Sequence, residues 1–162
     1  MLLNRRLAPI ALIALVCGCN DVAAPRPDIA VRATIDRTQF RVGDEVTIRA
    51  EVRNEGAAAA RVPVPSTMLE VRDASNRVVF FGRSGTFAAI GYPPRIVGPG
   101  DVVTESPMWA THVVGLTGGD APAGTYRVRV AVLLLRRSDY VIDAASVRYV
   151  FSEPIEVSVV DR

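Results

Sequence analysis

The side chains that most often carry catalysis or hold metals are sparse in this sequence. It has one histidine, His112, so it can form neither an HExxH motif nor a paired-histidine metal site. A Ser/His/Asp triad would need His112 as its base, but no GxSxG nucleophile elbow accompanies it. The carboxylates follow no calcium-loop spacing, and Gly115–Asp120 lacks the Gly-Lys-Ser/Thr ending of a phosphate-binding loop. The sequence therefore predicts a protein that is not an enzyme and holds no metal or other cofactor.

The first residues of the chain combine positive charge with an apolar run. Arg5 and Arg6 precede the run Leu7–Val16, which is too short to cross a membrane because a spanning helix needs about 20 apolar residues. A short positive region followed by such a run is typical of a secretory signal. We expect residues 1–18 to be a signal peptide that directs export.

A more specific motif ends this signal. Val16-Cys17-Gly18-Cys19 resembles the lipobox of bacterial lipoproteins, in which a small residue directly precedes the modified cysteine. The resemblance implies cleavage after Gly18 and attachment of diacylglycerol to the sulfur of Cys19. The alternative is an ordinary signal peptide cut nearby, which would leave Cys19 as a free thiol. Asn20, in the position where Asp would favour the inner membrane, favours the outer membrane.

Export changes the charge balance of the chain. The full sequence has 19 arginines, no lysine and 17 acidic residues. Cleavage after Gly18 removes two arginines and no acid, which leaves 17 of each and a net charge near zero. This balance argues against binding of nucleic acid and against a general affinity for anionic membrane surfaces. One remaining cysteine cannot form an intrachain disulfide, so the domain must be held together by its core.

Residues 19–28 are expected to be a lipidated tether. Asn20–Asp28 contains Pro25 and Pro27 and shows no hydrophobic periodicity. At about 3.1 Å per residue, this segment would hold the domain up to roughly 28 Å from the membrane.

Residues 29–162 show apolar residues with a period of two. Val46, Ile48, Ala50 and Val52 alternate with polar residues, and the same alternation recurs over Tyr126–Leu134. Such alternation is typical of half-buried antiparallel strands. Further candidate strands are Ile29–Ile35, Arg61–Val64, Met68–Val71, Arg77–Phe81, Val102–Ser106, Val147–Phe151 and Ile155–Val160. Short strands separated by Gly, Asn, Asp and Pro turns predict an all-β fold, a sandwich of about 7–9 strands.

Two local motifs refine this prediction. Ala123-Gly124-Thr125-Tyr126 resembles the tyrosine corner of immunoglobulin-like sandwiches, where a Tyr hydroxyl bonds back across the corner. Phe40–Asn54 resembles the first hairpin of many bacterial immunoglobulin-like domains, which implies that Phe40 caps the core and Gly43-Asp44 makes the turn. Together they favour an immunoglobulin-like antiparallel β-sandwich over residues 29–162.

The order of features between residues 31 and 135 resembles one bacterial family, the intracellular proteinase inhibitor (BsuPI-like) family. The matching features are the Phe40–Asn54 hairpin, Val71-Arg72-Asp73, Val78–Phe87, Ile96–Asp101, Trp109 and Gly124-Thr125-Tyr126. The resemblance implies an immunoglobulin-like fold and binding to a proteinase. The segment Pro65–Glu70 lacks the Gly-Gln and Asp of the family pattern.

The best candidate for a binding element is the stretch Gly82–Pro99, which shows little alternation and is predicted to be a long loop. Long loops are often functional, and Tyr and Arg are enriched at interface hot spots. The candidate binding residues are Arg83, Phe87, Tyr92, Pro93, Pro94 and Arg95. The alternative is a loop that packs its aromatic side chains back on the sandwich.

The arginines and the tryptophan allow two interpretations each. Arg49 and Arg53 on one strand, and Arg127 and Arg129 on another, fall on predicted solvent faces. The simpler interpretation is solubility and protection of edge strands; the other is a face that binds an acidic partner or a carboxylated envelope polymer. Trp109 fits the sandwich core better than an exposed contact.

These observations favour a non-catalytic, exported protein that is anchored to the membrane by lipid on Cys19 and binds or scaffolds a protein partner in the cell envelope. The alternative is an envelope proteinase inhibitor that acts through an exposed loop, here Gly82–Pro99. A third hypothesis is an accessory subunit that pairs with another chain through the edge of Val147–Val160. The sequence leaves the oligomeric state open.

Overall fold

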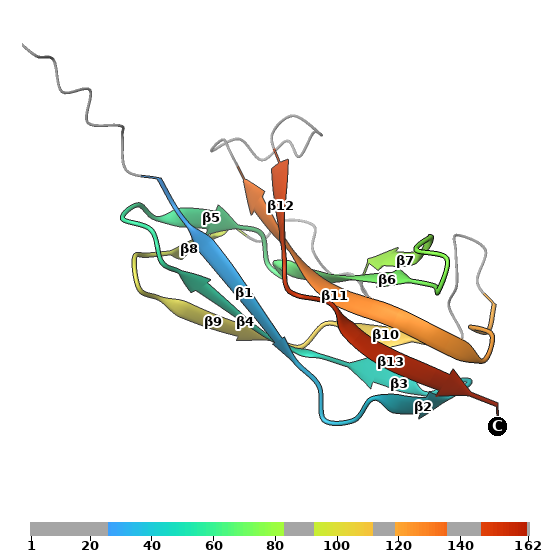
Figure 1. Ribbon diagram of the computed structural model, residues 1–162. Helices are drawn as coiled ribbons and strands as arrows, with labels where there is room; N and C mark the ends of the chain where they lie inside the picture. The colour runs from blue at the N-terminus through green and yellow to red at the C-terminus, as the bar shows by residue number, and fades with distance from the viewer. Residues whose placement is uncertain (1–25, 83–92, 112–118, 136–146, 162) are drawn as a thin grey trace, which may run out of the picture.

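Alternating apolar residues fold into strands that form two facing layers (Figure 1). The computed structural model describes residues 26–82, 93–111, 119–135 and 147–161. The smaller layer consists of β1 (Ile29–Thr34), β4 (Arg49–Asn54) and β9 (Val102–Glu105), continued by β3 (Glu45–Thr47) and β10 (Met108–Ala110). The larger layer consists of β2 (Gln39–Arg41), β13 (Ile155–Val160), β11 (Gly124–Leu135), β6 (Thr67–Arg72) and β7 (Val78–Gly82), with β12 (Val147–Phe151) also on β11. A separate pair is β5 (Ala60–Val62) and β8 (Arg95–Val97).

The predicted all-β, immunoglobulin-like sandwich is confirmed, with more and shorter strands than expected. The described residues contain 13 strands rather than seven to nine, and they include no helix that is long and apolar enough to cross a membrane. Three strands that periodicity does not predict, β2, β8 and β10, have three residues each, too few to show a period of two. All pairs are antiparallel except β2 with β13, which is parallel.

The predicted alternation over Val46–Val52 is confirmed, since all four apolar side chains are fully buried. The ladder opposite them is interrupted at Pro107, which has no N–H to donate. There the amide of Ile48 donates to the carbonyl of Pro107 at 3.1 Å. The register continues across the interruption, so β3–β4 and β9–β10 act as one long pair.

The prediction that Phe40–Asn54 forms a hairpin is wrong. Phe40 is buried as expected, but β2 pairs with β13 in the larger layer and β3 pairs with β10 in the smaller one. The turn at Gly43-Asp44 therefore carries the chain between layers. Gly43 has a φ of 94°, which favours glycine. The hydroxyl of Thr111 stabilises the turn by accepting from the Gly43 amide and donating to the Asp44 carbonyl, both at 2.8 Å.

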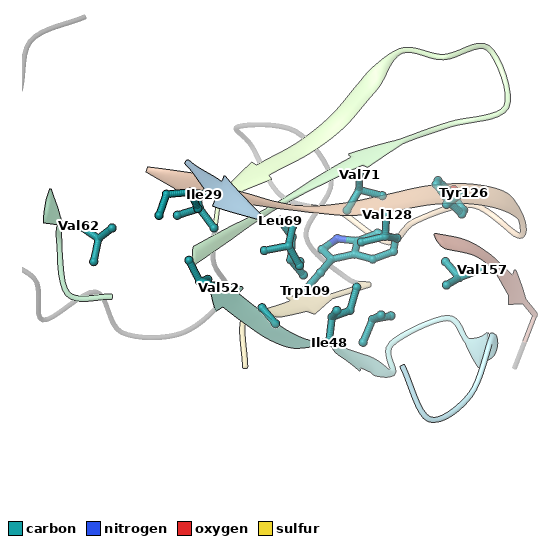
Figure 2. Packing of buried hydrophobic residues seen from close by; sticks show 14 of the residues in the cluster. Ile29, Ile48, Val52, Val62, Leu69, Val71, Trp109, Tyr126, Val128 and Val157 are labelled. Carbon is teal, nitrogen blue, oxygen red and sulfur yellow. The ribbon is translucent and has the colours of Figure 1, made fainter. Parts of the chain in front are cut away.

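Trp109 occupies the centre of the core between the layers (Figure 2). Its ring lies 5.6 Å from that of Tyr126 and 6.4 Å from that of Phe80, measured between centroids. Tyr126 forms the predicted tyrosine corner, because its hydroxyl donates to the Pro122 carbonyl at 2.7 Å. Burial, with a contribution from Asp73, raises the pKa of Tyr126, so the hydroxyl remains a donor at neutral pH.

Ser152 and Pro154 shift the register between β12 and β13, which pair with different halves of β11. The Ser152 hydroxyl accepts from the Val130 amide at 3.0 Å and so replaces a ladder bond. The outer edge of β13 already carries β2 at Ser158–Val160. The hypothesis that Val147–Val160 offers a free edge is therefore wrong for its second half.

A half-buried residue, Glu105, whose side chain is only 10% exposed, connects the two layers. It lies at the end of β9 and accepts hydrogen bonds from both the amides and the hydroxyls of Ser66 and Thr67, at the start of β6. The shortest bond, from the Thr67 hydroxyl, is 2.7 Å. Burial alone would raise the pKa of Glu105, but the hydrogen bonds from Thr67 and Ser66 outweigh burial and lower it.

Replacing Glu105 by Gln should destabilise the fold by about 3 kcal/mol at pH 7, because an amide group would face donors that need an acceptor. A lowered pKa means that the carboxylate stabilises the fold above its ordinary pKa, about 4.3, and that this contribution is lost as the pH falls through the folded-state value. Urea unfolding followed by Trp109 fluorescence should show the difference shrinking below about pH 4. Glu45→Gln, at an exposed position, is the control; a pH-independent difference for Glu105→Gln would contradict the assignment.

Candidate binding surface

The candidate residues named from the sequence are only partly described. Gly18, Cys19, Arg83, Phe87, Tyr92 and His112 lie outside the described residues. Pro93 is exposed, Pro94 is half-buried, and Arg95 is exposed as the first residue of β8. The prediction that Gly82–Pro99 is a loop throughout is therefore wrong at its end, because β8 pairs with β5 and buries Val97.

Charged side chains gather instead on the outer face of the larger layer, around Glu70. This residue of β6 is almost fully buried, and its Oε1 accepts from Nε of Arg72 at 2.6 Å and from Nε of Arg129 at 2.8 Å. Arg72 also donates to the Asn76 carbonyl at 2.9 Å. Burial would raise the pKa of Glu70, but hydrogen bonds from the two guanidinium groups lower it. One carboxylate thus holds two arginines in place.

Arg127 adds a third guanidinium group to this cluster. It lies opposite Arg72 in the β6–β11 ladder and opposite Glu156 in the β11–β13 ladder. Among the described residues, it has no ion pair within 4 Å. A like-charged cross-strand pair is unfavourable, so the positions of Arg72 and Arg127 favour a negative group between them. The three arginines line an open pocket of about 380 Å³ with Glu70, Asn76 and Pro154.

Aromatic rings continue the same face beyond the arginines. Phe81 on β7 contacts Tyr149 on β12 edge-to-face at 5.4 Å, and Tyr149 lies 6.2 Å from Phe151. Phe81 is 44% exposed and Tyr149 is 38% exposed. The guanidinium of Arg129 stacks over the Phe151 ring at 3.9 Å and so connects the arginine cluster to the aromatic rings. We call Glu70, Arg72, Arg127, Arg129, Phe81, Tyr149 and Phe151 the arginine–aromatic surface.

Only part of this surface is predictable from the sequence. Arg127 and Arg129 were placed on a solvent face by alternation along one strand, although Arg129 is only half exposed. Glu70 and the three aromatic residues belong to β6, β7 and β12, and only strand pairing brings them beside β11. The arginines of β4 are different: Arg49 has a weak ion pair with Glu51 at 3.7 Å, and no aromatic pair accompanies them in the described part of the chain.

The arrangement suits binding rather than bond-breaking chemistry. In the described part of the chain, no group of three or more His, Cys, Asp or Glu residues could hold a metal ion. Glu70 already accepts hydrogen bonds from two guanidinium groups and Glu105 from four donors, which leaves them poor general bases. Guanidinium groups recognise carboxylates and phosphates, and adjacent rings add apolar contact area.

Comparison with known proteins adds no family. No protein-family model and no curated protein matches the chain. Among solved structures, it is similar to the CARDB domain of a Pyrococcus furiosus protein, determined with di-metal ions, at 17% identity and a TM-score of 0.44, covering 83% of this chain and 89% of that one. It is also similar to β-glucosidases from Erythrobacter marinus (14% identity, TM-score 0.47, 83% of this chain) and Listeria innocua (12%, 0.49, 84%).

The chain spans 16% of the length of each of these β-glucosidases. Scores at this level establish neither a common family nor a common activity. The class of the protein, an all-β immunoglobulin-like sandwich, rests on its own strand pairing and tyrosine corner.

Replacing Glu70 by Gln should lower the free energy of unfolding by about 2 kcal/mol, because two partly buried guanidinium groups would lose their shared counter-charge. Glu51→Gln, whose carboxylate is exposed and forms a single weak ion pair, should cost no more than about 0.5 kcal/mol. Both values can be measured by urea unfolding at pH 7. Equal effects of the two substitutions would show that the Glu70 cluster is not a stabilising unit.

Proposed function

We propose that this protein is a lipid-anchored binding module of the bacterial cell envelope, without catalytic activity. The lipobox-like motif ending at Cys19 supports the anchor, and residues 19–28 would connect it to the sandwich. The observation that carries the binding role is the arginine–aromatic surface, where three guanidinium groups and three aromatic rings share one face. Export places this surface outside the cytoplasm, with the outer membrane favoured over the inner membrane by Asn20.

The chemistry of the surface defines the partner. Arg127, without an ion pair in the described residues, is the group available to a carboxylate of the partner. Phe81 and Tyr149 would cover an apolar side chain next to that carboxylate, and exposed aromatic residues and arginines are typical hot-spot residues. We therefore propose an acidic segment of another envelope protein as the partner.

Replacing Cys19 by Ala should move the protein from the membrane to the soluble fraction, or leave it with an uncleaved signal, and remove the acyl chains. Two or three chains anchor stably, because each buried methylene contributes about 0.8 kcal/mol. Intact mass of the protein purified from membranes should match residues 19–162 plus acyl chains. An unmodified mass of the native protein, or a mass shift that the Cys19→Ala variant shares, would refute the anchor.

Reversing the charge of Arg127 should weaken partner binding without unfolding the domain. A photo-crosslinking residue at Tyr149, in cells carrying the otherwise native chain, should give one crosslinked product that Arg127→Glu reduces roughly tenfold or more. Arg53→Glu is the matched control, because Arg53 is exposed on the smaller layer. Equal loss in both variants, or no loss in either, would contradict binding through this surface.

The alternative function, an envelope proteinase inhibitor of the BsuPI-like type, is supported by the order of sequence features. The exposed Pro93 and Arg95 at the described end of Gly82–Pro99 also favour it. In that case, shortening residues 83–92 should abolish proteinase inhibition and leave the Tyr149 crosslink intact. A native protein that inhibits no proteinase and still gives the Tyr149 crosslink would favour the binding module.

A further inference from the structure

A second pocket lies at the end of the sandwich where the tether joins it. It has a volume of about 640 Å³, and its lining includes Leu134, Leu135 and three arginines, Arg26, Arg61 and Arg148. Figure 1 shows the start of β1, strand β5 and the adjoining ends of β11 and β12 at this end of the molecule, away from β2, β3 and the C-terminus. The pocket thus combines an apolar floor with a positively charged rim.

Strand pairing brings this positive charge together. Arg148 lies opposite Leu134 in the β11–β12 ladder, and Arg61 lies on β5 opposite Ile96, which is 53% exposed. All three arginines are exposed, and none has an ion pair with another described residue. No acidic side chain lines the pocket in the described part of the chain. The mature chain has an expected net charge near zero, but it carries a local excess of positive charge around this pocket.

The position of the pocket relative to the anchor suggests what occupies it. Arg26 follows Cys19 by seven residues, and an extended proline-containing segment of that length spans roughly 22 Å at most. A lipid on Cys19 would keep this end of the domain within that distance of the bilayer surface. Guanidinium groups attract anionic headgroups when they lie within about one Debye length of the membrane surface.

We infer that this pocket binds an anionic phospholipid of the membrane that holds the anchor. The phosphate lies among Arg26, Arg61 and Arg148, and the upper acyl region lies against Leu134 and Leu135. The exposed Ile96 adds an apolar contact beside Arg61. This contact orients the domain, so that the arginine–aromatic surface is held at a defined position above the bilayer. The inference rests on the proposed lipid anchor.

The test uses the lipidated protein purified from membranes and reconstituted into vesicles. Because acylation occupies Cys19, a single added cysteine can be labelled with a bimane fluorophore. Ala59→Cys places the label at the pocket, and Ser75→Cys places it in the exposed β6–β7 turn as the matched control. Vesicles contain phosphatidylcholine alone or with 30% phosphatidylglycerol, each with a spin-labelled lipid as quencher.

We expect stronger quenching at position 59 in phosphatidylglycerol vesicles than in phosphatidylcholine vesicles, with no such difference at position 75. Changing Arg26, Arg61 and Arg148 together to Gln should remove this difference in quenching. Each arginine should strengthen binding to the anionic surface roughly fivefold. Arg32→Gln with Arg53→Gln, on the smaller layer, should leave it unchanged. Equal quenching in both vesicle types, or quenching that survives the triple change, would overturn the inference.

Flotation of the same samples separates this inference from the anchor itself. Protein that floats with vesicles but shows no dependence on phosphatidylglycerol retains its anchor and lacks the lipid site. Protein that does not float lacks the anchor, and the inference then fails with it.

Discussion

The structure depends on the hydrogen-bonded carboxylate of Glu105 between two apolar layers. No disulfide can join the layers, because the sequence has no cysteine after Cys19. A carboxylate in this position is tolerated only when donors surround it, and Ser66 and Thr67 supply them. With Thr67 fixed on the inner face, the period of two places Leu69 inward and Glu70 on the outer face. The polar contact at Thr67 and the buried Leu69 thus place the same side chains of β6 on its outer surface.

The outer face then follows from β11, the strand on which most of the larger layer assembles. Its odd-numbered residues point outward and change from Arg127 and Arg129 to Ala131 and Leu133 along the strand. Neighbouring strands continue this change, with Glu70 beside the arginines and Phe151 beside Ala131. The result is a face that is charged at one end and aromatic at the other.

The other end of the molecule is organised by Asn54, a fully buried polar residue whose side chain uses all its hydrogen-bonding capacity. Its Nδ2 donates to the carbonyls of Ala58 and Val97, and its Oδ1 accepts from the amides of Asp28 and Gly56. A side chain at Gly56 would meet the backbone of Arg26–Asp28, which explains the glycine. These contacts fix residues 26–28 at the point where the chain enters β1, beside the second pocket.

The sequence by itself determined the fold class, the alternation that buries Val46–Val52, and the tyrosine corner, because a period of two and local turn chemistry are properties of neighbouring residues. It also predicts the signal and the lipid anchor, which lie outside the described residues. Only the tertiary structure decided that Phe40–Asn54 crosses between layers, that β8 ends the supposed loop, and that arginines and aromatic rings from four strands form one surface. The physical reason is that these features depend on which distant strands exchange backbone hydrogen bonds, and no local pattern encodes that choice.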